Sequence, residues 1–394
     1  MRSANRILTT HGGSLVRPPE LLPFLLKQER REYFDAAEFG RKLNRAVGEV
    51  VRKQAEAGVD IVSDGEYGKS INWSRYILER ITGFEERENP LGTVRAVAGK
   101  DRRDFAEFYA EYEAAEGFVG LGKEARRAGR WVVTGPIQYI GQKVIQRDIA
   151  NLKAALQGVN GVTGFMAGVA PASVAPERED EFHRSEEEGL FAIADALHEE
   201  YRAIVDAGLM LQVDDAFLPI VYDLMVPPRT LADYRKWVAV RIEALNHALK
   251  GIPAERVRYH LCWGSWNGPH TNDVAAKDIV DLVLKVNVGA YSLEMANPRH
   301  EHEWRVWENA KLPEGRVLIP GVISHSTNVV EHPELVAERI VRLAKLVGRE
   351  NIIGGTDCGF AQGPFTRRVH PSIMWAKLGS LAEGARLATK ALWP

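Results

Sequence analysis

The chain has 394 residues, of which 45% are hydrophobic and 26% charged, a composition typical of soluble globular proteins. Its 51 Lys and Arg residues against 53 Asp and Glu residues give a formal net charge of −2, which argues against a nucleic-acid-binding surface. No apolar run approaches the roughly 20 residues needed to span a bilayer, and two cysteines cannot form a disulfide framework.

The N-terminal stretch MRSANRILTTHGG contains neither a long apolar segment nor a small-residue cleavage pattern. It is therefore not typical of a secretory signal peptide. Together with the low cysteine content, this predicts a cytoplasmic protein whose two cysteines serve some purpose other than a disulfide bond.

Short apolar runs rich in β-branched residues alternate along the chain with longer amphipathic segments. The runs predict strands at residues 7–14, 61–66, 131–135, 168–174, 209–215, 257–264, 290–296, 317–323 and 352–358. Helical patterns lie between them. Residues 38–58 place Leu43, Val47, Val50, Val51 and Ala55 on one stripe, and residues 334–347 repeat the pattern after His332 and Pro333.

Regular alternation of strands and helices indicates parallel strands joined by right-handed crossovers. Eight or nine such units predict a single (β/α)8 barrel of the TIM type over residues 1–394, with a doubly wound open sheet as the alternative. Two polar stretches, residues 82–102 and 175–188, are expected to be loop excursions. They are either solvated surface or a lid over an active site on the C-terminal face of the barrel.

Polar side chains gather at or just past the C-terminal ends of the predicted strands. They are Glu66, Asp214, Asp215, Cys262, Glu294, His325 and Cys358. In a barrel of parallel strands these ends converge on one face, where active sites of this fold are built. The positions predict one functional site at that face.

His260 and Cys262 are two residues apart on a predicted strand, so their side chains point the same way. Glu294 ends the next strand, and Cys358 ends a strand further along the chain. Two sulfurs, one nitrogen and one carboxylate oxygen would suit a tetrahedral Zn²⁺ ion. The alternative is that both cysteines are small core residues and that His260 is a hydrogen-bonded core histidine.

The sequence resembles the cobalamin-independent methionine synthase superfamily, in particular its shorter methionine-synthase-II-type and epoxyalkane:coenzyme M transferase-like members. The resemblance covers nearly the whole chain. It rests on TTHGGSLVRP at residues 9–18, VSDGE at 62–66, LQVDD at 211–215, HLC at 260–262, LEMANPRHEHE at 293–303, IPGVISHSTNVVEHPEL at 319–335 and GGTDCGF at 354–360. It implies a barrel whose zinc is held by His260, Cys262, Glu294 and Cys358.

The resemblance also implies substrate-binding positions. Ser14 matches a loop that binds an amino acid's carboxylate, and Glu66 and Asp214 match acids that hold its ammonium group. Arg17 could hold a carboxylate or sulfonate, or form a surface salt bridge. His325 matches a proton-donating histidine only with a one-residue gap, so a structural histidine is the alternative, and Asp214 and His325 are the expected catalytic residues.

Three further features leave alternatives open. Asp215 departs from the family, where a Glu followed by proline stands at that point. The charged run at residues 300–303 is either a second metal site or a solvated helix start. Four tryptophans either wall the pocket or pack in the core: Trp73, Trp263, Trp266 and Trp375.

The expected function follows from thiol chemistry. Only a few per cent of a free thiol is ionised at neutral pH, and coordination to Zn²⁺ removes the proton while leaving a sulfur nucleophile. The sequence therefore predicts a zinc-dependent enzyme that transfers a methyl or small alkyl group to or from a small thiol such as homocysteine. The alternatives are a coenzyme M-type C–S bond enzyme acting on epoxides, a uroporphyrinogen-type decarboxylase, and a non-catalytic zinc-binding barrel.

The expected partners are a small-molecule thiol and an alkyl donor, with no nucleic acid and no membrane; homo-oligomerisation is left open. The chain is too short for the second, N-terminal barrel of full-length family synthases, which helps them bind folate. A folate-using enzyme is therefore less expected than a stand-alone alkyltransferase.

Overall fold

The computed structural model describes residues 2–88, 99–117, 129–366 and 368–394. Its centre is a sheet of eight parallel strands in the order β1-β11-β10-β9-β8-β7-β5-β2. The strands are β1 Leu8–Thr9, β2 Ile61–Ser63, β5 Thr163–Val169, β7 Met210–Asp214, β8 Val257–Leu261, β9 Ala290–Leu293, β10 Val317–Ile323 and β11 Ile353–Thr356. Between the first and last strands of this order, the Asp60 amide donates to the Thr9 carbonyl at 3.2 Å.

The sheet is thus a nearly closed barrel in which neighbouring strands follow one another in the chain. This confirms the predicted TIM-type (β/α)8 fold and rules out the doubly wound open sheet, whose strand order reverses. Of the helices that the structure describes, none is both long and apolar enough to cross a lipid bilayer.

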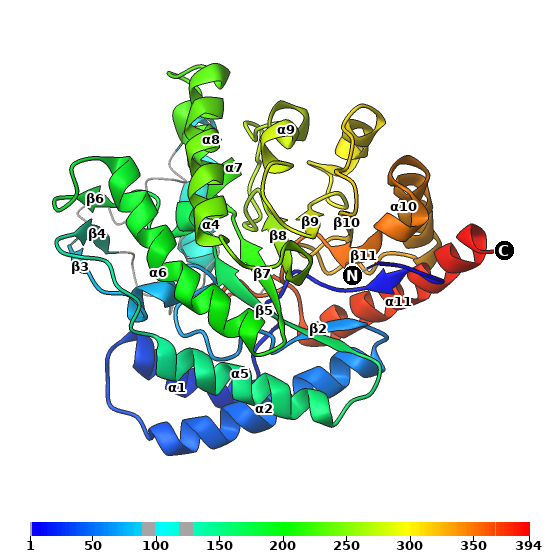
Figure 1. The fold of residues 1–394 in the computed structure, drawn as a ribbon, viewed down its shortest axis with the longest axis horizontal. Coiled ribbons are helices and arrows are strands. Elements are labelled where there is room, and N and C mark those ends of the chain that lie inside the picture. Colours follow the sequence, from blue (N-terminus) through cyan, green and yellow to red (C-terminus); the bar gives the residue numbers. More distant parts are fainter. Residues whose placement is uncertain (1, 89–98, 118–128, 367) are drawn as a thin grey trace.

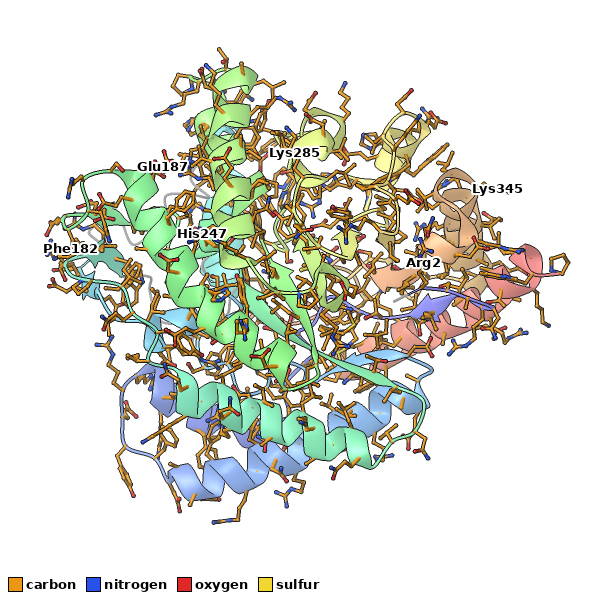
Figure 2. The ribbon with its side chains drawn as sticks, in the orientation of Figure 1. Arg2, Phe182, Glu187, His247, Lys285 and Lys345 are labelled. Atoms are coloured by element: carbon orange, nitrogen blue, oxygen red, sulfur yellow. The ribbon has the colours of Figure 1, made fainter. Side chains whose placement is uncertain are left out.

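Helices surround the barrel (Figure 1). They are α1 Leu22–Glu29, α2 Ala36–Glu56, α3 Lys100–Asp104, α4 Ala106–Glu116, α5 Gln142–Gln157, α6 Glu186–Asp206, α7 Phe217–Met225, α8 Leu231–Ala248, α9 Val280–Val283, α10 Pro333–Val347 and α11 Pro371–Leu392. The predicted stripe of α2 is buried, and the Asp35 side chain caps this helix by accepting from two backbone amides. Charged side chains such as Glu187, Lys285 and Lys345 lie on the outer surface of this layer (Figure 2).

One of the nine predicted strands lies outside the barrel. Residues 131–135 correspond to β4, Arg130–Val133, which pairs antiparallel with β3, Phe84–Arg87, and parallel with β6, Glu179–Asp180. This small sheet lies at one side of the molecule (Figure 1). An apolar run of this length is the same in a barrel strand and in a side sheet, so the pattern could not separate them.

Both predicted excursions contribute to the small sheet. β3 lies in the stretch 82–102, of which residues 89–98 fall outside the described residues, and β6 lies in the stretch 175–188, which ends in the first turn of α6. The side chain of Ser185 caps that helix by accepting from the Glu188 amide at 3.1 Å. Each excursion follows the carboxyl end of a barrel strand, β2 or β5.

The predicted strand at residues 168–174 is displaced toward the C-terminus relative to β5, Thr163–Val169. Gly164, near the start of β5, is an unfavourable strand residue by propensity. A Cβ at this position would come within 2.5 Å of a terminal methyl of Leu156, so the strand lies close against α5 at this point. Close packing of helix on strand overrides the local preference.

A buried ion-pair cluster joins the loops after β2 to α5 and α6. The Arg80 guanidinium donates to Glu200 and to Asp148, each at 3.0 Å, and the hydroxyls of Tyr76 and Tyr139 donate to Glu200 at 2.7 Å. All five side chains are buried. Burial opposes the charge of Glu200, but Arg80 and the two hydroxyls hold the pKa of this carboxyl below its usual value.

Candidate metal centre

Three potential metal ligands converge at the carboxyl ends of the barrel strands. His260 and Cys262 come from β8 and the residue after its end, and Cys358 lies just past β11. Their ligand atoms all lie within 4.8 Å of one another, and all three residues are buried. The side chains of adjacent residues in a strand point to opposite faces, so a spacing of two residues puts the imidazole and the thiol on the same side.

The ring of His260 is held by one nitrogen and leaves the other without a partner. Nδ1 lies 3.0 Å from the Ser292 hydroxyl on the neighbouring strand β9. Nε2 is buried and has no hydrogen-bond partner among the described residues. A buried, unpaired ring nitrogen beside two thiols is unfavourable unless a ligand occupies it. This arrangement is typical of a metal-binding histidine whose other nitrogen is fixed by a neighbour.

We expect Ser292→Ala to lower the affinity for the metal by about 10- to 100-fold without unfolding the protein, because it removes the group that orients the His260 ring. Competition with a chromophoric chelator would measure the affinity. Ser380→Ala on α11 is the matched control, because Ser380 is also buried and its hydroxyl donates to the Glu331 carbonyl rather than to a proposed metal ligand. An unchanged affinity in Ser292→Ala would contradict this role.

The two thiols differ in their tendency to ionise. Contact with Cys262 and the nearby His260 lower the pKa of Cys358 well below its usual value, against the effect of burial. Burial, together with Cys358 and Glu294, raises the pKa of Cys262. The two thiols therefore lose one proton readily. They lose the second only when a positive charge lies nearby, and a divalent cation would supply that charge.

Glu294 is buried at the same face but is not one of the three converging groups. One carboxylate oxygen accepts from the Trp263 amide at 2.8 Å, and the other accepts from Asn297 at 2.7 Å and from Arg299 at 3.0 Å. Its nearness to the thiols is evident in its contribution to the raised pKa of Cys262. The role of Glu294 as a fourth ligand stays a prediction.

The donor set fits zinc. Two sulfurs and an imidazole nitrogen select this ion over magnesium or calcium, which prefer oxygen ligands. Within the described ranges, no second group of three such side chains converges in this way. In particular, His300 contacts Asp273 at 3.2 Å and Glu303 at 2.7 Å, so the charged run at residues 300–303 forms ion pairs rather than a second metal site.

Apolar side chains surround the two thiols. Ala216 and Ile220 form a buried cluster with Cys262 and Cys358, and three aromatic side chains pack against it: Trp73, Phe217 and Trp266. Trp73 stacks on Phe217 at a centroid distance of 5.8 Å. The Trp263 indole instead donates to the Val274 carbonyl, and Trp375 packs in the main core. Two of the four tryptophans thus line the site.

The loop after β1 lies directly against the turn that carries Cys358. The amide of Phe360 donates to the Ser14 carbonyl at 2.8 Å, and a Cβ on Gly359 would meet the Ser14 hydroxyl at 2.0 Å. Ser14 therefore lies next to Cys358, and its role in binding the substrate stays a prediction. Arg17 is buried and donates to the backbone carbonyls of Ala361 and Glu66, so it is not a surface salt bridge.

Glu66 and Asp214 lie close to each other at the rim of the centre. Asp214 accepts from the Gln212 amide group at 2.6 Å. A Cβ on Gly13 would come within 2.8 Å of a Glu66 carboxylate oxygen and 3.2 Å of that Gln212 nitrogen. Burial and the negative charge of Glu66 raise the pKa of Asp214 to about 7, against the effect of His260 and Lys69. The structure thus brings together the two predicted acids.

His325 is fully buried beside the centre, and neither ring nitrogen has a hydrogen-bond partner in the described part of the chain. Burial lowers its pKa, while Cys358 and Glu294 oppose that effect. A neutral imidazole in this place can accept or donate a proton. Asp215 differs: its carboxylate accepts from Ser173 at 2.7 Å and from Tyr259 at 2.9 Å, which gives it a structural role.

Three residues of the site were not predicted from the sequence. Ser292 orients His260, Arg299 holds Glu294, and Lys69 lies 2.9 Å from Glu66. Isolated polar residues of this kind have no distinctive sequence signal. Ser292 lies inside the predicted strand 290–296, two residues before Glu294, and this spacing is the one signal that could have drawn attention to it.

The chain is similar to proteins of one known family. The family model described as the catalytic domain of cobalamin-independent synthase matches residues 96–372. A 2-hydroxypropyl-CoM lyase from Xanthobacter autotrophicus is 23% identical over 372 residues, covering 88% of this chain and 85% of that protein. A methionine synthase from Saccharolobus solfataricus is 23% identical over 388 residues, covering 98% of this chain and 95% of that protein.

Solved structures show the same fold. A B12-independent methionine synthase from Shewanella sp. W3-18-1, in complex with selenomethionine, aligns with a TM-score of 0.69 and 19% identity over 98% of this chain and 99% of that one. A protein from Listeria monocytogenes named as a putative vitamin-B12-independent methionine synthase aligns with a TM-score of 0.63 and 19% identity over 97% of this chain and 98% of that one. Both likenesses extend over nearly the whole chain.

Proposed function

The chain belongs to the cobalamin-independent methionine synthase family, and we propose that it is a zinc-dependent enzyme that transfers a methyl or small alkyl group to or from a small thiol. The observation that carries this proposal is the convergence of His260, Cys262 and Cys358 around an unpaired imidazole nitrogen. Few other groups would satisfy two thiols and a ring nitrogen in a buried place.

His260, Cys262 and Cys358 would hold the metal, and Glu294 would complete the set. When bound, zinc supplies a positive charge that keeps a substrate thiol ionised at neutral pH. Asn297 and Arg299 already hold one Glu294 oxygen, so this carboxylate would keep those two partners if a substrate thiol took its place among the ligands. The protein's cysteines act as ligands in this scheme and not as nucleophiles.

The other residues bind the substrate and handle protons. The aromatic wall of Trp73, Phe217 and Trp266 excludes water from the reacting sulfur. Ser14, Arg17, Glu66 and Asp214 are assigned to the tail of the thiol. His325, buried and unpaired at both nitrogens within the described ranges, is assigned to proton transfer, with Asp214 as a second titrating group.

Two substrates agree with this site. Homocysteine methylation is suggested by relatives named methionine synthase, and a coenzyme M-type reaction at a C–S bond is suggested by the relative named 2-hydroxypropyl-CoM lyase. The tail of the thiol distinguishes them, because an amino acid carries an ammonium group and coenzyme M a sulfonate. The partners we propose are a small thiol and an alkyl donor in the cytoplasm, where the free cysteines stay reduced.

We expect the zinc-loaded protein to release about one proton for each thiol bound when the pH is well below the thiol's own pKa of about 8.5. Titration calorimetry in buffers of different ionisation enthalpy measures this release as a buffer-dependent heat. Because the substrate thiol is protonated in solution and ionised in the site, protons are released on binding and not taken up. Cys358→Ser is expected to abolish the release.

A titration in which a bound thiol releases no proton would mean that it binds protonated. The protein would then be a zinc-binding barrel without this catalytic activity, which is the rival interpretation. A closed zinc site that takes up no thiol at all would support the same rival.

A further inference from the structure

A buried aspartate links two of the turns that carry proposed metal ligands. Asp357 comes directly before Cys358 in the turn after β11, and its side chain is fully buried. One of its carboxylate oxygens accepts from the backbone amides of Met295 and Ala296, each at 2.8 Å. These amides belong to the turn after β9, which begins with Glu294. One side chain therefore joins the turns of two ligands that lie far apart in the chain.

The link crosses β10, the strand that lies between β9 and β11 in the sheet. Gly321 of β10 lies against Asp357 at the crossing. A Cβ at Gly321 would come within 2.1 Å of an Asp357 carboxylate oxygen and 2.5 Å of the Asp357 Cα. The second of these atoms is backbone and cannot turn away, so the close approach depends on a residue without a side chain at this point.

Asn297 bridges the carboxylates of Asp357 and Glu294. Its side-chain amide donates to the second Asp357 oxygen at 3.0 Å and to a Glu294 oxygen at 2.7 Å. An amide NH₂ group carries two hydrogens, so each carboxylate receives one. The Asn297 side-chain oxygen accepts from the backbone amides of Arg299 and His300, at 3.1 and 3.2 Å, which fixes the orientation of the group. The two carboxylates are thus held at a set separation by one oriented amide.

The donors around Glu294 leave it one acceptor position. A carboxylate can accept about four hydrogen bonds. In the hydrogen bonds described, one oxygen accepts from Asn297 and Arg299, and the other accepts only from the Trp263 amide. A metal ion could take the remaining position on the second oxygen while all three donors stay in place. The arrangement therefore suits a single bond from Glu294 to the metal, with its direction set by these donors.

We propose that Asp357 is a positioning residue that, through Asn297 and the turn at residues 295–297, sets the place of the Glu294 carboxylate relative to the Cys358 thiol. This inference rests on the proposed function, because it concerns the fourth ligand of the same metal centre. Among the hydrogen bonds of the described residues, the Asp357 side chain makes none to a side chain of the four proposed ligands. Its effect on the metal therefore passes through Glu294.

The test is a double-variant cycle on the zinc affinity of the full chain, measured by competition with a chromophoric chelator. The variants are Asp357→Asn, Glu294→Gln and the two combined. Asp357→Asn keeps the size of the side chain and one acceptor oxygen for the turn, but its amide would face the amide of Asn297, donor against donor. Asp60→Asn is the matched control, because Asp60 also accepts from a backbone amide, that of Thr9 at 2.9 Å, but stands before β2 at the opposite end of the barrel.

We expect Asp357→Asn to lower the zinc affinity by about 10- to 100-fold, as for other groups that orient a metal ligand. Glu294→Gln is expected to lower it by at least the same factor. The double variant is expected to bind zinc as weakly as Glu294→Gln alone, within about 2-fold, because Asp357 then has no ligand left to position. Asp60→Asn is expected to keep the wild-type affinity.

The inference is overturned if Asp357→Asn weakens zinc binding by the same factor with and without the Glu294 carboxylate. The effect would then come from the lost negative charge or from a displaced Cys358 turn. It is also overturned if Glu294→Gln leaves the affinity unchanged, a result that needs no change at Asp357. Should Asp357→Asn not fold, Asn297→Ala removes the same bridge and is expected to show the same coupling to Glu294.

The outcomes also separate this inference from the proposed function. If the wild type binds no zinc, the proposed function itself fails. If the wild type binds zinc and a folded Asp357→Asn binds it equally well, only the inference about Asp357 fails.

Discussion

Replacing Cys262 or Cys358 by serine is expected to lower the zinc affinity by more than about 100-fold. Removing even a group that only orients a ligand costs roughly 10- to 100-fold, and a serine hydroxyl is a poor substitute for a thiolate toward zinc. Purified wild type should contain one zinc per chain, whereas each variant should contain close to none after dialysis. Elemental analysis under reducing conditions makes the measurement.

Ser380→Ala is the control for this experiment, since the hydroxyl of Ser380 donates to the Glu331 carbonyl and not to a proposed metal ligand. Circular dichroism would establish that the cysteine variants remain folded. The thiols lie in a small apolar cluster apart from the main core, so we expect the fold to persist. Full zinc occupancy in both cysteine variants would show that the metal is bound elsewhere.

Arg80→Met is expected to destabilise the protein by about 3–5 kcal/mol, the range found when one partner of a buried ion pair is removed. The guanidinium contacts Glu200 and Asp148, and the variant would leave Glu200 buried without its counter-ion, whereas Asp148 keeps its ion pair with Arg147. Urea unfolding followed by circular dichroism measures the difference. Arg202→Met, on the exposed side of α6, is the control and should leave the midpoint nearly unchanged.

The pH dependence gives a second check on the same cluster. The folded-state pKa of Glu200 lies below its usual value, so its contribution to stability is present above about pH 4.5 and is lost as the pH falls through the folded value. In Arg80→Met the guanidinium no longer opposes the effect of burial on Glu200, so the pKa of this carboxyl is expected to rise. The difference in the free energy of unfolding between wild type and Arg80→Met should therefore be largest at neutral pH and become smaller toward pH 4. A difference in unfolding free energy that does not change with pH would contradict this explanation.

The barrel was predictable because each of its strands carries a local signal. β10 matches the predicted residues 317–323 at both ends, and α10 begins one residue before the predicted residues 334–347. β4 was predicted as a strand, but its membership of the side sheet depends on pairing with β3 and β6, which are 43 or more residues away in the chain. Long-range pairing leaves little trace in a short apolar run.

The site was predictable where chemistry and position coincide. His260, Cys262 and Cys358 are residue types that bind metals, and they stand at strand ends, so the sequence placed them together correctly. Asp357 and Ser292 act only through the residues that tertiary structure brings beside them. Their roles follow from contacts with Asn297 and His260, which one sequence does not encode in any local pattern.

The central claim is that this centre holds a substrate thiol on zinc, and X-ray absorption at the zinc edge tests it most directly. The zinc-loaded wild type should show two sulfur ligands, from Cys262 and Cys358, with the rest nitrogen or oxygen. Addition of the substrate thiol should raise the count to three sulfurs at about 2.3 Å, with the loss of an oxygen ligand. A coordination shell that stays unchanged, at a thiol concentration shown to saturate the protein, would contradict the account.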